Sequence, residues 1–179
     1  MTHVTNCMKI IALMFFFVIG RGPATAQTTS YIPALDKFTG TWRWVSGSDT
    51  VEIALQKQLI YINAVTPIYV ESLIGWHRYV KNGTLIENSM QYYGRNYDSS
   101  FNLNNVKSTL IGATQKPTNL YLSFTDLTLN KREELWFTLL PNSLTQATWK
   151  LREARGLYMG PSGTAGRITL PKDIVLTKQ

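Results

Sequence analysis

The chain has 179 residues, of which 44% are hydrophobic and only 16% charged, and its formal net charge at pH 7 is +7. This length fits one domain. The hydrophobic fraction excludes an intrinsically disordered chain, because such chains lack the apolar surface that offsets the entropy of ordering. The twelve glycines and seven prolines also exclude a collagen-like or linker-like composition.

The N-terminal segment has the pattern of a secretory signal peptide. Lys9 precedes the mainly apolar run Ile10 to Gly20, which is shorter than the roughly 20 residues that a membrane-spanning helix needs. Ala24-Thr25-Ala26 then provides a small-residue cleavage site. We therefore expect residues 1–26 to be a signal peptide and residues 27–179 to be one mature domain. The mature protein is expected in the periplasm or outside the cell, with no transmembrane segment after cleavage.

Cleavage would change the chemistry available to the mature chain. It removes Cys7, the only cysteine, so the mature protein has neither a disulfide nor a cysteine-based metal site. The basic residues that remain are scattered along the chain. We therefore expect no nucleic acid partner and at most a weak attraction to anionic envelope surfaces.

After Gly40, most apolar stretches alternate with a period of two, so that Leu120, Leu122 and Phe124, for example, share one face. This alternation indicates strands with one buried face. We expect strands at 41–46, 50–57, 59–63, 68–80, 84–91, 106–114, 119–126, 134–140, 144–152 and 173–178. Only residues 32–39 are expected to form one or two helical turns. Short strands without crossover helices predict an all-β protein with a single antiparallel up-and-down barrel of about eight to ten strands, or a β-sandwich as the alternative.

The sharpest turn signal is Asn82-Gly83, which suits a two-residue type I′ hairpin turn. This turn would place Lys81 opposite Thr84 and Val80 opposite Leu85. The same register would pair Arg78 with Glu87 and His77 with Asn88.

Two groups of residues carry resemblances. The stretch Phe38 to Trp42, which contains Gly-Thr-Trp, resembles the start of the first strand in lipocalin-type barrels, where an arginine such as Arg152 or Arg155 would cover the tryptophan. The Ala-Gln junction, Gly-Thr-Trp, the hairpin from Gly75 to Gly83 and the ending Leu170 to Lys178 resemble small exported Bacteroidota proteins, an uncharacterised family with a domain of unknown function. Together, these resemblances imply export and a lipocalin-like β-barrel domain over residues 27–179, and they imply no activity.

Most candidate chemistry has a simpler explanation. His77 is the only histidine of the mature chain, which favours a polar cross-strand contact over a metal site. Ser162 lies in a glycine-rich loop whose spacing fits neither a nucleophile elbow nor a phosphate cradle. Glu133 and Glu134 are expected to be a solvated charge cluster, and Asp126 to end its strand at the barrel rim. We therefore expect no enzyme activity, no catalytic residues, no metal and no cofactor.

One stretch, residues 92–98, has the composition of a recognition surface, because it combines three tyrosines with Arg95, Asn96 and Asp98. The candidate ligand-binding residues are Trp76, Tyr92, Tyr93, Arg95 and Tyr97. The first hypothesis is a non-catalytic binding module that holds a small apolar or amphipathic ligand in the barrel interior or mouth. The alternative is an envelope interaction or structural protein with a filled barrel and a protein or glycan partner. An internal cavity of roughly 300 Å³ or more would favour the first.

Overall fold

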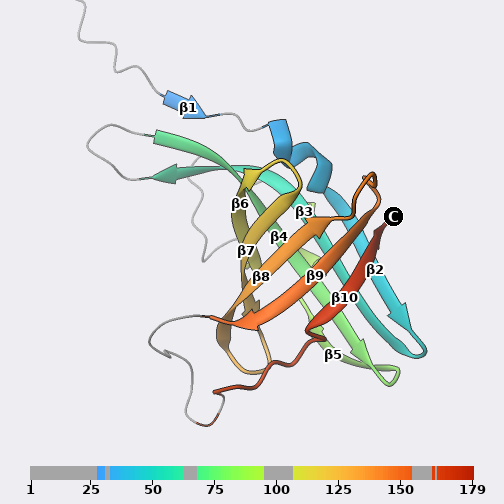
Figure 1. Ribbon diagram of the computed structural model, residues 1–179. Helices are drawn as coiled ribbons and strands as arrows, with labels where there is room; N and C mark the ends of the chain where they lie inside the picture. Colours follow the sequence, from blue (N-terminus) through green and yellow to red (C-terminus); the bar gives the residue numbers. More distant parts are fainter. Residues whose placement is uncertain (1–27, 31–32, 63–67, 95–106, 155–162, 164) are drawn as a thin grey trace, which may run out of the picture.

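Eight strands of the protein close into an antiparallel up-and-down barrel, as the sequence predicts (Figure 1). The structure is a computed structural model and describes residues 28–30, 33–62, 68–94, 107–154, 163 and 165–179. The strands are β1 (Thr28–Ser30), β2 (Gly40–Ser46), β3 (Asp49–Ile62), β4 (Ile68–Lys81), β5 (Thr84–Asn88), β6 (Leu110–Lys116), β7 (Asn119–Asp126), β8 (Lys131–Leu139), β9 (Gln146–Glu153) and β10 (Asp173–Lys178). The two 3-10 helices are η1 (Pro33–Phe38) and η2 (Met90–Tyr92).

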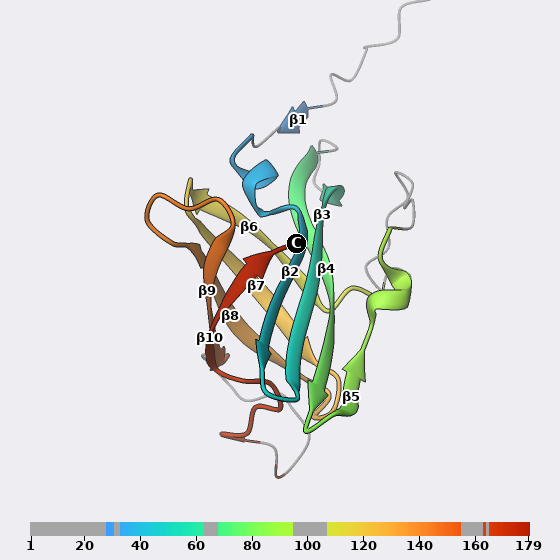
Figure 2. The same ribbon diagram turned by 90° about the vertical axis from the view of Figure 1, so that its right-hand side faces the viewer.

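The barrel wall runs in the order β2, β3, β4, β6, β7, β8, β9 and β10, and β10 returns to pair with β2. All of these pairings are antiparallel. One edge of β4 pairs with β3, and along its other edge β1, β6 and β5 pair with successive parts of the strand. Only β1 pairs in parallel. Strand β5 therefore lies beside the barrel wall and not within it (Figure 2).

The predicted strands 50–57 and 59–63 are one strand, β3, whose pairing with β4 continues from Thr50 to Ile62. In the structure, Lys57 is half-buried and forms ion pairs with Asp36 and Glu71. The predicted helical turns are confirmed as η1, and the described residues contain no α-helix. No helix in the described part of the chain has the length and apolarity to cross a membrane.

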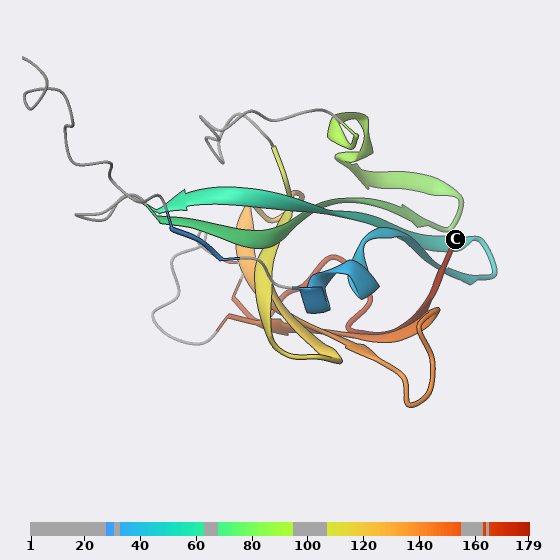
Figure 3. The same cartoon turned by 90° about the horizontal axis from the view of Figure 1, so that it is seen from above.

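Large side chains fill the barrel interior. Every strand of the barrel contributes to one buried cluster, to which η1 adds Leu35 and Phe38. Figure 3 shows η1 lying across one end of the barrel. The Trp42 ring meets the Phe137 ring edge-on, with centroids 5.0 Å apart, and its Nε1 donates to the Phe38 carbonyl oxygen over 2.8 Å. Lys178 lies over Trp42, with Nζ 5.4 Å from the ring centroid, and the candidate Arg152 instead pairs with Asp173. The other candidate, Arg155, lies outside the described residues.

The hairpin turn is confirmed, but the predicted register beyond it is wrong. Asn82 and Gly83 have φ values of 50° and 75°, and Lys81 lies opposite Thr84. An irregularity follows, after which Tyr79 lies opposite Glu87 and Arg78 opposite Asn88. One extra residue on β5 causes this shift, because a bulge places two residues against one. The predicted pairs Arg78 with Glu87 and His77 with Asn88 therefore do not form, and Glu87 turns into the interior.

The turn itself gives a stability prediction. A side chain at position 83 would meet nothing within 4 Å, so the cost of Gly83→Val comes only from the strain of a β-branched residue at φ +75°. We expect this variant to lose about 1 kcal/mol or more of unfolding free energy, measured by urea denaturation. Gly83→Asn, which tolerates positive φ, serves as the control and should lose less. Equal stability of the valine variant and the wild type would contradict the type I′ turn.

Candidate functional site

The predicted ligand-binding residues that the structure describes lie on the outside of the barrel wall. Trp76 is fully buried, but it belongs to a separate apolar cluster with Ile74, covered by Met90, Tyr92 and Ile111. Its ring centroid lies 5.8 Å from that of Tyr93. Arg95 and Tyr97 lie outside the described residues.

The segment from β5 to Tyr93, next to the Trp76 cluster, exposes several apolar side chains. Leu85, Ile86 and Tyr93 are 52%, 40% and 38% exposed. Among the described strands, β5 pairs only with β4, which leaves its other backbone edge unpaired. We call residues 84–93 the β5 edge. Lys107 lies over the Tyr92 ring at 5.3 Å from its centroid.

A buried polar network fixes the β5 edge to the barrel. The His77 ring bonds to Thr109 Oγ1 over 2.8 Å and to Glu87 Oε2 over 2.7 Å. The Glu87 carboxylate also accepts hydrogen bonds from the backbone N–H groups of Leu127 and Thr128. Burial alone would raise the pKa of Glu87, but the hydrogen bonds from His77 and Thr128 lower it to about 2. The expected polar contact of His77 thus exists, with a different partner.

A second buried charge cluster corrects the expectation for Glu133. This residue lies inside the barrel, with its Oε1 2.9 Å from Lys131 Nζ, while Glu134 is half-buried on the opposite face. Lys131 also reaches Glu153 at 3.3 Å. Burial raises the pKa of Glu133, despite the opposing effect of Lys131. The expectation of a solvated cluster fails because the inward alternation of β8 continues through these charged residues.

Asp126 is likewise buried, and its role is structural. Its two carboxylate oxygens accept the backbone N–H groups of Leu129 and Thr169 and the Thr169 hydroxyl, all within 3.0 Å. The carboxylate therefore fixes both the β7–β8 turn and the segment that leads to β10. The described residues hold no group of three His, Cys, Asp or Glu side chains arranged to bind a metal ion.

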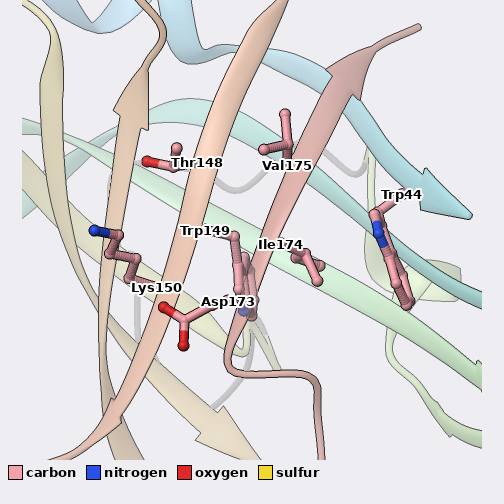
Figure 4. A pocket seen from close by; sticks show the side chains of 7 residues that line it. All are labelled: Trp44, Thr148, Trp149, Lys150, Asp173, Ile174 and Val175. Carbon is pink, nitrogen blue, oxygen red and sulfur yellow. The ribbon is translucent and has the colours of Figure 1, made fainter. Parts of the chain in front are cut away.

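A hollow of about 480 Å³ opens on the surface between β2 and β10 (Figure 4). Strands β2 and β10 pair only where Arg43 meets Thr177 and Trp42 meets Lys178. Beyond these pairs they separate, and the hollow lies against the separated ends. Its lining residues are Trp44, Thr148, Trp149, Lys150, Asp173, Ile174 and Val175.

Comparison with known proteins gives one match. A family model described as a family of unknown function (DUF6705) matches residues 7–179. No curated protein and no solved structure matches the chain.

Proposed function

The chain belongs to the DUF6705 family of unknown function, and we propose from its own residues that it is an exported, non-catalytic interaction protein with a filled barrel. The filled interior carries this proposal. A lipocalin-like module that holds a small apolar or amphipathic ligand needs an internal cavity, typically 300 Å³ or larger. Here the rings of Trp42, Phe137, Phe124 and Trp149 and the surrounding leucines occupy that space. The outer surface is therefore the favoured place for recognition.

The β5 edge is the part of the outer surface that best fits a protein partner. An unpaired strand edge offers backbone N–H and C=O groups on which an extended segment of another chain can add. Leu85, Ile86 and Tyr93 add exposed apolar area beside this edge. The hydrogen bond between Glu87 and His77 holds the edge in a fixed orientation, which lowers the entropy lost on binding.

Export supports the same proposal, because the leader pattern would deliver the protein to the envelope or the medium. Recovered protein should have an intact mass that begins at Gln27. The proposal that the protein is non-catalytic rests on the buried polar residues His77, Glu87 and Asp126. Their side chains already form hydrogen bonds that hold the fold together.

Site-specific photo-crosslinking in intact cells tests the partner surface. A photoreactive phenylalanine analogue at Leu85 or Tyr93 should give a discrete crosslinked protein product. The same analogue at Leu144, which is 61% exposed on the β8–β9 turn, is the matched control and should give none. Ile86→Pro, which disrupts the edge, should abolish the product while the melting temperature stays within a few degrees.

The ligand-in-barrel hypothesis predicts a different result. Titration with a fatty acid would then quench intrinsic tryptophan fluorescence saturably, because Trp42 and Trp149 line the interior. We expect no saturable quenching. Saturable quenching, or equal crosslinking at Leu144 and Tyr93, would contradict the proposal.

A further inference from the structure

A row of outward-facing side chains crosses strands β7 to β10 at one level. Tyr121 pairs with Trp136, Trp136 with Lys150, and Lys150 with Asp173. The neighbouring residues on each strand point into the core, so this row faces outward. The rings of Tyr121 and Trp136 lie 5.6 Å apart at an interplanar angle of 63°, and Tyr121 is 48% exposed. Together they form an aromatic platform.

The row carries one cation that no carboxylate neutralises directly. Arg152 holds Asp173 through two hydrogen bonds, of 2.8 and 3.2 Å. Lys150 is exposed and forms no ion pair within 4.0 Å among the described residues. The hydrogen bond from Arg152, together with the nearby charges of Lys150 and Lys172, lowers the pKa of Asp173. Around Lys150, three cations (Lys150, Arg152 and Lys172) therefore stand against two carboxylates (Asp173 and Glu134).

The hollow beside β10 continues this row. Lys150 and Asp173 belong both to the row and to the lining of the hollow, together with the Thr148 hydroxyl and Val175 (Figure 4). Its volume of about 480 Å³ suits a small ring system and not a flat protein interface. The platform, the free cation and the hollow thus form one continuous surface.

We propose that this surface, defined by Tyr121, Trp136, Lys150 and the adjoining hollow, binds a carboxylate-bearing saccharide. The C–H groups on the face of a sugar ring carry partial positive charge and pack on the negative face of an aromatic ring. Lys150 would pair with the sugar carboxylate, and Thr148 and Asp173 would bond to hydroxyl groups. The site is separate from the β5 edge and goes beyond the function proposed for it.

Calorimetric titration of the full mature protein with tetragalacturonate tests this site, with neutral galactotetraose for comparison. We expect saturable binding of the acidic oligosaccharide, weaker by about tenfold or more in Trp136→Ala and by about threefold or more in Lys150→Gln. Lys81→Gln, which removes an exposed lysine at the β4–β5 turn, is the matched control and should bind as the wild type does. Raising the salt concentration should weaken binding of the acidic probe.

Three results would overturn the proposal. The first is no saturable binding of tetragalacturonate, and the second is equal binding by Trp136→Ala when circular dichroism shows that its fold is intact. The third is tighter binding of a single-stranded oligonucleotide, whose bases also stack on aromatic rings. Crosslinking at Leu85 and Tyr93 should be unchanged in Trp136→Ala. A failure at this site is therefore distinguishable from a failure of the β5-edge proposal.

Discussion

Replacing Glu87 with alanine is expected to lower the free energy of unfolding by about 3–5 kcal/mol. The substitution leaves the buried His77 ring and the backbone N–H groups of Leu127 and Thr128 without their acceptor. Urea denaturation followed by tryptophan fluorescence measures the loss. Thr84→Ala, on the exposed part of the same strand, is the control and should change stability by less than about 0.5 kcal/mol. A small loss of stability in Glu87→Ala would mean that the hydrogen bonds of Glu87 do not fix β5 to the barrel.

The same carboxylate makes stability depend on pH in a defined window. Its pKa is about 2 in the folded protein, against an ordinary value of 4.5. A lowered folded-state pKa gives stabilisation that is present above the unfolded pKa and is lost as the pH falls towards the folded pKa. The stability difference between the wild type and Glu87→Gln should therefore shrink as the pH falls from about 4.5 towards 2. A difference that stays constant at pH 3 would contradict the low pKa.

The second large effect is expected at Phe137. Phe137→Ala should cost about 3–5 kcal/mol, because it removes a fully buried ring that packs against both Trp42 and Phe38. Trp136→Ala, one residue earlier on β8 and on the outer face, should cost only about 1 kcal/mol, mainly from its contact with Tyr121. Denaturant midpoints of the two variants make the comparison. Equal losses would contradict an interior filled by packed side chains.

The alternation of apolar residues predicted the strands well where one face is apolar and the other polar. On β8, Leu135, Phe137 and Leu139 lie inside as expected. The prediction failed two residues earlier, at Glu133, which continues the same inward face together with Lys131. A charged residue at an inward position of the alternation is normally predicted to be exposed, because burying an ion is costly. Here the two residues lie close enough to form an ion pair, a pairing that the sequence alone does not reveal.

The candidate site was predicted only in part, for a similar reason. Trp76, Tyr92 and Tyr93 do lie together, but β4 is buried on both faces near Trp76, since η2 covers its outside. Periodicity cannot tell which of two apolar faces is the inner one. The bulge in β5 also shifted Glu87 by one residue, which reverses the face of a strand side chain. The row of Tyr121 and Trp136 was missed because it depends on the register between neighbouring strands.

The uneven strength of the barrel wall has a consequence for its motions. Strands β3 and β4 pair along their whole shared length, whereas β10 and β2 meet at Arg43, Trp42 and, through the Gln179 N–H, Thr41. Local opening costs least where few backbone hydrogen bonds must break. Amide protons between β2 and β10 should exchange with solvent through a partial opening of the barrel, whereas those between β3 and β4 should exchange only through global unfolding. Among the described barrel strands, the β2–β10 seam has the fewest paired positions, two against three between β4 and β6. The barrel should therefore open first along the β2–β10 seam, which borders the hollow beside β10.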